Sequence, residues 1–405
     1  MKKVFWISLM APYDGVAHAG GKIHNYLLKY LNNEKNIDIT LLTFASEKEK
    51  EYIDNDHYHY NIKSKIHYFK EDKINRIGRK TINHIFFLSK LAGKGSFLNR
   101  KTLKRKIKEY KKQNDDPDYV ILHWTSIINN IGWIKKEFPN AKFIVIEEDV
   151  TFLKVYRKII SLKGIKRIVS NKIYGHFKKN EVASLTLSNL IIVNNDKDRL
   201  LLENEKINNN ILSISPYFTN FDNLKYKYKK ENILFYGAMN RPENYEAAIW
   251  FIESVFYKLK KYNKDFKFIV LGGNPNKKLL SYESNDIIIT GFVDKIDEYF
   301  SDSLCLVAPL LMGAGVKIKI LEGLSSGIPV LTNEIGIEGI PAKEGRDFLL
   351  SKKPEDYISN ILELTRNKDF TLSVSKNAKE FIKKNYNYKK SAEQLKKYIL
   401  DGEIH

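Results

Sequence analysis

Short apolar runs alternate along the chain with longer segments in which apolar residues recur every three or four positions. Runs of four to eight apolar residues are typical of buried strands, and the longer spacing is typical of helices. The expected strands are residues 4–10, 37–44, 120–123, 142–146, 190–194, 211–215, 232–236, 266–271, 287–290, 304–308 and a strand that opens at 329. The expected helices are residues 22–31, 196–204, 244–262, 297–301, 316–324, 356–366, 372–385 and 391–400. This alternation predicts an α/β fold with parallel sheets.

The pattern restarts after residues 220–231, a charged and tyrosine-rich stretch that reads as a hinge. We therefore expect an N-terminal domain over residues 1–215 and a C-terminal domain over residues 216–385. Residues 386–405 are expected to form a terminal helix that packs back towards the N-terminal domain.

Residues 304–340 carry the clearest chemical signal and read as strand, glycine loop, helix, tight turn and strand. Gly313 and Gly315 leave a loop where the backbone can approach a ligand closely. A loop of this kind at a helix start binds anions, because free N–H groups and the positive end of the helix dipole face the ligand.

Lys317 and Lys319 add positive charge beside that helix start, and Glu322 follows Lys319 by three residues. In an alternative interpretation, Lys319 and Glu322 are an ordinary surface pair worth a few tenths of a kcal/mol, ~0.2–0.5, and the glycines form plain turns. The combination of loop, basic residues and acid in one arrangement favours an anion site.

The segment resembles the donor-binding half of GT-B glycosyltransferases, in particular the retaining family 4. The family pattern G-x-G-x-[KR]-x-K-x-x-E-[AG], followed by G-x-P-V, is matched at Gly313, Gly315, Lys317, Lys319, Glu322, Gly323, Gly327, Pro329 and Val330. Many members carry a second glutamate where this chain has Ala314, so the contacts to the donor sugar stay open. The resemblance implies a GT-B fold, with two doubly wound Rossmann-like domains facing each other across a cleft.

The resemblance also implies a nucleotide-diphosphate sugar as co-substrate, with no metal and no other cofactor. Glu322 would bind the ribose hydroxyls, and Lys319 would hold the diphosphate. The loop residues expected to join Lys319 in donor binding are Gly313, Gly315, Val316 and Lys317. Arg241 would also reach the diphosphate, or else be a surface arginine, and Phe292 and Val293 would meet the base.

In the first half, the resemblance places Gly20 and Gly21 at a loop near the diphosphate, unless they form an ordinary turn. His123 ends an expected strand and would face the donor sugar, which adds it to Lys319 and Glu322 as the expected catalytic set. A lone histidine at a strand end is also often structural.

Three consecutive acids, Glu147, Glu148 and Asp149, end another expected strand and are candidates for binding acceptor hydroxyls. In an inverting enzyme one of them would serve as general base. The family that the sequence resembles is retaining, so we expect the leaving phosphate to take the acceptor proton.

Composition supports packed domains, because 43% of the residues are hydrophobic and they include 22 Phe and 24 Tyr. The single cysteine, Cys305, allows no internal disulfide, which is typical of the cytoplasm. No apolar run reaches the roughly 18–20 residues that span a bilayer. Residues 2–19 imitate a signal peptide, but Pro12 and Asp14 interrupt the apolar run, so a first buried strand is the preferred interpretation.

The net charge of +20 is uneven: residues 1–215 hold 39 Lys and Arg against 23 Asp and Glu, a balance of +16. Residues 94–112 and 150–180 each contain nine basic residues, with one acid in the first segment and none in the second. This asymmetry favours an anionic membrane surface as partner, unless it reflects a generally lysine-rich composition. We expect no nucleic-acid partner, because no base-stacking module is present.

These observations together predict a cytoplasmic glycosyltransferase, peripheral on the inner face of the plasma membrane, acting on a glycan or lipid-linked acceptor in surface polysaccharide or glycolipid synthesis. The alternative is a catalytically idle GT-B protein that binds a sugar nucleotide or glycan as a partner subunit. A nucleotide-sugar epimerase shares the fold but lacks the signature. The sequence does not predict the oligomeric state.

Overall fold

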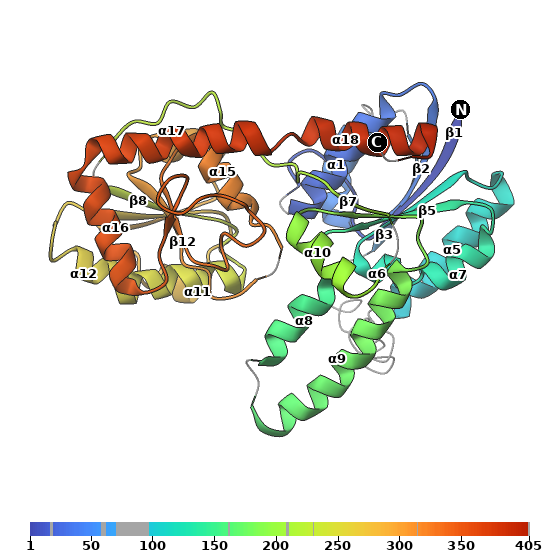
Figure 1. Cartoon of the computed structure of the whole chain (residues 1–405), viewed down its shortest axis with the longest axis horizontal. Helices are drawn as coiled ribbons and strands as arrows, with labels where there is room; N and C mark the ends of the chain where they lie inside the picture. Colours follow the sequence, from blue (N-terminus) through green and yellow to red (C-terminus); the bar gives the residue numbers. More distant parts are fainter. Residues whose placement is uncertain are drawn as a thin grey trace. The chain divides into compact units, whose positions relative to one another are not determined.

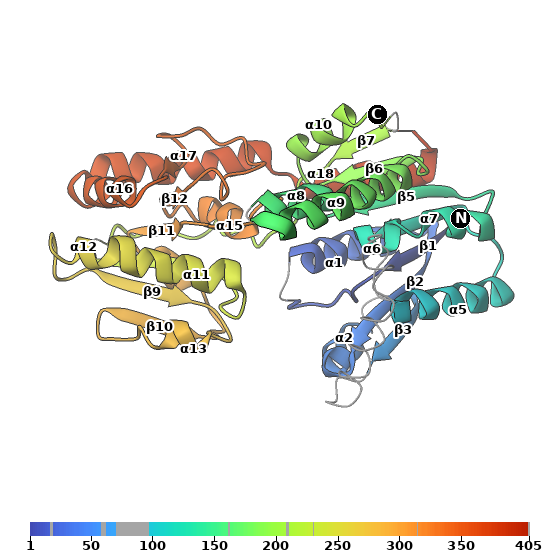
Figure 2. The ribbon, with the colours of Figure 1, turned by 90° about the horizontal axis from the view of Figure 1, so that it is seen from below.

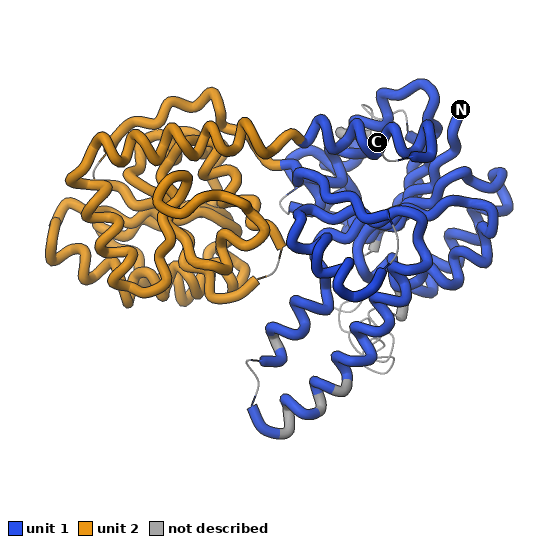
Figure 3. The backbone as a smooth tube through the Cα atoms, in the orientation of Figure 1, with its two compact units in different colours: residues 1–217, 388–405 blue, residues 218–387 orange. Residues whose placement is uncertain are grey.

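The computed structural model describes residues 1–16, 19–57, 62–69, 97–160, 163–207, 210–229, 231–313 and 315–403. These residues form two compact units, which Figure 3 shows in different colours. Unit 1 consists of residues 1–217 together with 388–405, and unit 2 consists of residues 218–387. The chain therefore passes from unit 1 to unit 2 and back again.

Unit 1 is built on a seven-stranded sheet in the order β3-β2-β1-β4-β5-β6-β7, and every described strand pair in it is parallel. Its strands are β1 (Lys2–Ser8), β2 (Ile37–Ser46), β3 (Lys63–Phe69), β4 (Tyr119–His123), β5 (Lys142–Glu147), β6 (Leu190–Val193) and β7 (Asn210–Ser213). The central strands are apolar on both faces, which is the pattern of a parallel sheet covered on two sides.

Helices cover both faces of this sheet (Figure 1). Alternate residues of β1 show the division: Phe5 and Ile7 join one apolar cluster, whereas Val4 and Trp6 join the other. The first face is covered by α5 (Phe97–Gln113), α6 (Thr125–Ile128), α7 (Ile131–Glu137), α9 (Gly164–Leu185) and α10 (Asp196–Asn204). The second is covered by α1 (Ala19–Asn32) and α18 (Tyr388–Asp401).

Two helices of unit 1 form a hairpin: α8 (Thr151–Ile160) lies beside the long helix α9 in both Figure 1 and Figure 2. The short elements η1 (Glu47–Glu49) and α2 (Lys50–His57) follow β2. Among the described residues, no helix combines the length and the apolar composition needed to cross a membrane.

Unit 2 has a six-stranded sheet in the order β10-β9-β8-β11-β12-β13, again with parallel pairs among the described residues. Its strands are β8 (Asn232–Tyr236), β9 (Lys267–Leu271), β10 (Ile287–Gly291), β11 (Cys305–Ala308), β12 (Val330–Thr332) and β13 (Leu349–Leu350). Its helices are α11 (Pro242–Phe251), the π-helical segment η2 (Ile252–Phe256), α12 (Tyr257–Leu259), α13 (Lys277–Leu280), α14 (Asp297–Ser301), α15 (Ile318–Ser326), α16 (Pro354–Arg366) and α17 (Lys368–Asn385). One continuous apolar cluster fills this unit.

The expectation of a GT-B fold is confirmed in its essentials, since each unit is a parallel sheet covered by helices. Several elements differ from the sequence-based expectation. The expected helix over residues 244–262 contains the wider turn η2. The elements β3, α2 and α5 come from a region in which the sequence pattern predicts no element.

Candidate functional site

The candidate residues of unit 2 lie at the carboxyl ends of neighbouring strands. Phe292 and Val293 follow β10, the loop that contains Arg241 follows β8, and the glycine loop follows β11. In the sheet these strands are close neighbours, because β9 lies between β10 and β8, and β8 is bonded to β11. Ligands of open parallel sheets bind at this edge. The fold therefore brings together residues that are up to about 80 positions apart in the sequence.

The glycine loop ends two residues later than the sequence indicates. The helix α15 begins at Ile318, because Lys317 is extended (φ −91°, ψ 98°) and serves as the N-cap residue. Gly315 has φ 70°, which favours glycine, and its carbonyl accepts a hydrogen bond from Lys317 Nζ at 2.5 Å. Val316 is thus a loop residue, and Ala314 lies outside the described residues.

Lys319 contacts Asn244, which is not among the site residues predicted from the sequence. Its Nζ donates to Asn244 Oδ1 at 2.6 Å and lies 5.1 Å from the centre of the Phe235 ring. The Asn244 amide in turn donates to the carbonyl of Ala238 at 2.9 Å. A Cβ added at Gly237 would lie 2.8 Å from Lys319 Nζ, so the end of β8 touches the ammonium group. Burial lowers the pKa of Lys319 to about 7.

Glu322 is buried at 2% exposure, so it is not part of an exposed surface pair. Its carboxylate accepts a hydrogen bond from the Tyr236 hydroxyl and a long one, 3.4 Å, from the Thr219 amide. Burial, together with the charge and hydrogen bond of Glu322, raises the pKa of Tyr236 above its ordinary value. The surface-pair alternative for Lys319 and Glu322 is therefore wrong.

Two further candidates of unit 2 are open to solvent. Phe292 is 79% exposed and lies beside the end of β9, where a Cβ at Gly273 would be 3.6 Å from its own Cβ. Arg241 is exposed at the N-cap position of α11, and its charge helps to lower the pKa of Lys319. Val293 is half-buried against the core.

In unit 1, the fold gathers candidates around Glu148. His123 at the end of β4 is fully buried, and its Nε2 lies 2.5 Å from Glu148 Oε1. Asn194, after β6, donates from its side-chain amide to Glu148 Oε2 at 3.0 Å. A Cβ at Gly20 would lie 3.1 Å from the Glu148 carboxyl carbon. Gly20 and Gly21 both lie in the first turn of α1, which begins at Ala19 rather than at residue 22.

Aromatic side chains surround His123 on several sides. The Trp124 ring stacks on it at 4.1 Å between centroids, and the His24 ring meets it edge-on at 4.9 Å. Trp124 has φ 73°, an uncommon conformation for a bulky residue. His24, Trp124 and Asn194 have no distinguishing signal in the sequence, because each becomes a neighbour of His123 or Glu148 only through the fold.

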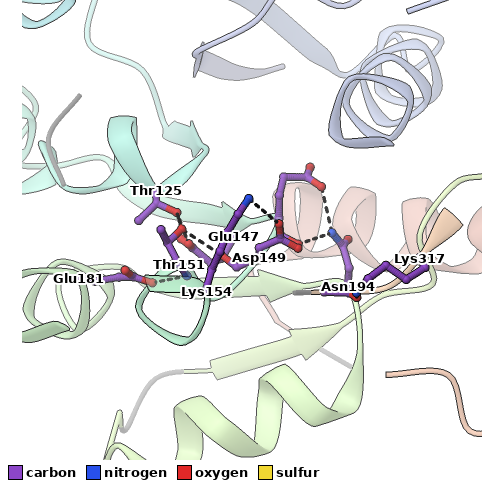
Figure 4. A network of polar contacts seen from close by, with 10 residues as sticks. Thr125, Glu147, Asp149, Thr151, Lys154, Glu181, Asn194 and Lys317 are labelled. Carbon is purple, nitrogen blue, oxygen red and sulfur yellow. Dashed lines mark hydrogen bonds and ion pairs between the residues drawn. The ribbon is translucent and has the colours of Figure 1, made fainter. Parts of the chain in front are cut away.

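The three consecutive acids do not stay together. Asp149 lies 4.0 Å from Lys154, whereas Glu147 turns towards the hairpin and is 1% exposed. Figure 4 shows Glu147 bonded to Thr125, which contacts Thr151 at 2.6 Å between hydroxyl oxygens.

Glu147 shares this buried region with a second carboxyl, Glu181, which is 0% exposed. One oxygen of Glu181 accepts from the amides of Thr151 (2.8 Å) and Phe152 (3.3 Å) at the start of α8 (Figure 4). Each of the two carboxyls has one buried oxygen without a hydrogen-bond partner. Burial raises the pKa of Glu181 to about 8, and burial together with Glu181 raises that of Glu147 well above its ordinary value. We call Glu147 and Glu181 the buried carboxyl pair.

Within the described part of the chain, no group of three or more His, Cys, Asp or Glu side chains is arranged to hold a metal ion.

Comparison with known proteins finds a family similarity in the second unit. Residues 230–367 match the family described as Glycosyl transferases group 1. The matched segment is about a third of the chain and is similar to group 1 glycosyl transferase domains. It contains the whole donor-side arrangement described above, from Arg241 to Glu322.

Two curated relatives match the chain in sequence. An uncharacterized 44.6 kDa protein in the cps region of Klebsiella pneumoniae is 30% identical over 168 residues, 39% of this chain and 43% of the relative. The match therefore spans less than half of that relative. An uncharacterized glycosyltransferase of Methanocaldococcus jannaschii is 27% identical over 304 residues, 69% of this chain and 74% of the relative.

Solved structures extend the similarity of fold to the whole chain. TarM of S. aureus is similar with a TM-score of 0.68 at 13% identity, covering 98% of this chain and 99% of TarM. HepE of Anabaena in complex with UDP is similar with a TM-score of 0.65 at 10% identity, covering 99% and 100%. The chain has the GT-B fold of these proteins.

Proposed function

We propose that this protein is a glycosyltransferase that moves a sugar from a nucleotide-diphosphate sugar to a glycan or lipid-linked acceptor. The observation that carries the proposal is the arrangement of Lys319, Asn244 and Glu322 behind the glycine loop of a segment similar to group 1 glycosyl transferase domains. Cation, loop amides and a buried carboxylate at one sheet edge suit a nucleoside diphosphate.

On the donor side, Lys319, Arg241 and the amides around Gly313, Gly315 and Lys317 would bind the diphosphate. Positive charge placed where the leaving group gains negative charge is the largest contribution to such a transfer. Glu322 would accept hydrogen bonds from the ribose hydroxyls, and the exposed ring of Phe292 with Val293 would contact the base. These groups supply the charge stabilisation without a metal or another cofactor.

In unit 1, we assign binding of the donor sugar to His123 and to the backbone of Gly20 and Gly21. The hydrogen bond between His123 and Glu148 fixes the orientation of the His123 ring. Glu148 and Asp149 are the acceptor-side groups. Glu147 turns towards the hairpin, where it accepts a hydrogen bond from Thr125, and we give it no contact with the acceptor.

For the reaction we infer retention of configuration at the anomeric carbon. The acceptor hydroxyl oxygen forms the new bond on the face from which the diphosphate leaves, and a diphosphate oxygen takes the hydroxyl proton. NMR of the product tests this step, since a product of inverted configuration would require a general base from the protein.

A role in cell-surface polysaccharide or glycolipid synthesis, with a hexose or related sugar, is the biological setting we propose. The name of the Klebsiella relative, which places it in a cps region, supports this setting. A cytoplasmic enzyme held against the anionic inner face of the plasma membrane fits the balance of +16 over residues 1–215.

The decisive test measures nucleotide binding by the purified full-length protein. The melting temperature is recorded with UDP, GDP, ADP and CMP in the presence of a chelator. UDP is the first choice, because the similar HepE of Anabaena forms a complex with UDP. A ligand that binds only the folded state raises the melting temperature. We expect one nucleotide to raise it, and Glu322→Ala to abolish the rise.

The matched control is Glu355→Ala, which removes an exposed glutamate paired with Lys258 at the start of α16. It should leave the nucleotide effect unchanged. If no nucleotide shifts the melting temperature of the folded protein, the donor-site proposal fails. Binding without turnover of any sugar nucleotide would instead favour a catalytically idle partner subunit.

A further inference from the structure

The hairpin of α8 and α9 extends away from the sheet of unit 1 (Figures 1 and 3). With 22 residues, α9 is about 33 Å long, so its first turns lie far from the strands. Ile160 ends α8 and Gly164 begins α9, so these two residues mark the distal end of the hairpin.

Both helices of the hairpin contribute buried apolar side chains. Phe152 and Ile159 of α8 are buried, as is Phe177 of α9. Glu181 of α9 accepts hydrogen bonds from the first amides of α8, which ties the two helices together near the sheet. The direction of the hairpin is thus fixed at its base.

Towards the distal end, large apolar side chains face solvent. Ile168 is 62% exposed, Ile160 is 49% exposed and Tyr156 is 44% exposed. Tyr156 and Ile160 are four residues apart and lie on one face of α8. Exposed apolar side chains that gather in one region are typical of sites that contact a membrane or another protein.

The same end is strongly basic. Residues 150–180 contain nine Lys and Arg and no acid. Lys163 and Arg167 are exposed near the distal end. Lys154 and Lys178, nearer the sheet, pair with carboxylates outside the hairpin. Lys163 and Arg167 therefore place positive charge at the distal end, close in sequence to Ile160 and Ile168.

We propose that the distal end of this hairpin binds an anionic lipid bilayer, with Ile160 and Ile168 entering the interface and Lys163 and Arg167 contacting lipid headgroups. Basic residues flanking bulky aliphatic ones are the composition of helices that lie in a membrane interface. Nucleic acid is the less suitable partner, because single strands stack on aromatic rings and gain little from exposed isoleucines. The inference rests on the proposed function, since a lipid-linked acceptor would be reached at the bilayer surface.

Binding of the full-length protein to vesicles tests the charge contribution. Sedimentation at about 150 mM salt would compare phosphatidylcholine vesicles with vesicles containing phosphatidylglycerol, for the wild type and for Lys163→Gln/Arg167→Gln. We expect the wild type to prefer anionic vesicles, and the variant to bind them about 30-fold more weakly, since two charges are removed. The control is Lys101→Gln/Lys108→Gln, which removes two exposed charges from the basic helix α5 and should change binding much less.

A site-specific probe tests insertion. The chain has one cysteine, Cys305, which is buried, so Ile168→Cys introduces an accessible thiol for an environment-sensitive fluorophore. We expect its emission to shift to the blue with anionic vesicles. Leu200→Cys, at a 51% exposed leucine of α10, is the matched probe and should not shift.

Each outcome separates this proposal from the proposed function, because nucleotide binding is measured on the same samples. Vesicle binding that is lost in the hairpin variant, with the nucleotide effect retained, supports the proposal. The membrane proposal is overturned if the wild type binds nucleotide but not vesicles, or if the hairpin and α5 variants lose the same amount of vesicle affinity. It is also overturned if single-stranded RNA displaces the protein from vesicles at a concentration below that of the lipid. Failure of nucleotide binding with intact vesicle binding would instead remove the glycosyltransferase assignment.

Discussion

The buried carboxyl pair gives a stability prediction with a definite sign. Glu147 and Glu181 are 1% and 0% exposed, and both carboxyls have a raised pKa. A folded-state pKa above the unfolded value means that the native protein keeps a proton that the unfolded chain has released. The stabilisation is therefore complete below the unfolded value near 4.5 and is lost as the pH rises towards about 8. The variant that tests this is Glu147→Gln/Glu181→Gln, which removes both titrating groups.

The size of the effect follows from the number of retained protons. Each proton that the pair retains makes the free energy of unfolding fall by about 1.4 kcal/mol for each pH unit. Between pH 5.5 and pH 7.5 the wild type should thus lose about 3 kcal/mol of unfolding free energy for each retained proton, relative to the double variant. Glutamine keeps the shape and can still accept from the amides of Thr151 and Phe152, so the variant is expected to fold.

Tryptophan fluorescence during urea unfolding can follow unit 1 selectively. Of the four tryptophans, Trp6, Trp124 and Trp133 belong to unit 1, and Trp250 belongs to unit 2. In a Trp250→Phe background, the signal therefore reports on unit 1 alone. The quantity to compare is the pH dependence of the unfolding free energy, with and without the double substitution.

The control is Asp116→Asn, which removes an exposed carboxylate from the same unit. Its unfolding free energy should follow the wild type at every pH. Parallel pH profiles of the wild type and the double variant between pH 5.5 and pH 7.5 would refute the prediction, because the pair would then hold no extra proton.

Three further predictions concern unit 2. The pKa of Lys319 is about 7, and a bound diphosphate favours its charged form. UDP affinity should therefore fall by up to about tenfold per pH unit as the pH rises above 7. Calorimetry should show proton uptake on binding, and Lys319→Arg should make UDP affinity depend less on pH. Asn244→Ala should weaken UDP binding by about tenfold, since it removes one charge-assisted hydrogen bond of ~1.5 kcal/mol from Lys319; unchanged affinity would mean that Asn244 does not position the ammonium group. Gly272→Ala should lower the free energy of unfolding in urea by about 3 kcal/mol or more, because its Cβ would lie 1.7 Å from the Gly237 carbonyl oxygen. The comparison is Gly15→Ala in unit 1, where a Cβ meets nothing within 4 Å but φ is +78°, and the cost should be only about 1–2 kcal/mol.

The fold class could be predicted from the sequence because its central strands are short apolar runs bounded by turn residues. The expected helix at residues 196–204 has the same bounds in the structure, where the Asn195 side chain caps the Asp198 amide. The helix α5 escaped prediction although Leu103, Ile107 and Tyr110 have helical spacing and are buried. The helix is rich in lysine, and its few apolar positions form only a narrow stripe, so the helical spacing is difficult to recognise in the sequence.

The candidate site was predictable where it lies within one short motif, and less so where it is assembled from distant elements. The spacing of Lys319 and Glu322 is visible in the sequence, but Asn244 is 75 positions from Lys319 and meets it only in the folded protein, through the hydrogen bond from Lys319 to Asn244. The acids at residues 147–149 form a single cluster only in the sequence. Successive side chains at a strand end point in opposite directions, so Glu147 and Glu148 lie in different surroundings.

The position of α18 has a consequence for the order in which the protein is made. Ala392, Leu395 and Ile399 of this helix belong to the apolar cluster that covers one face of the unit 1 sheet. During synthesis, the core of unit 1 therefore cannot be completed until residues 388–401 are translated, although most of unit 1 is translated first. Unit 2 is contiguous, so it can complete its core while that face of the earlier unit is still bare. A holdase chaperone should accordingly bind nascent chains that stop near residue 385 and release those that extend past residue 401, and equal binding to both would show that the face is covered in another way.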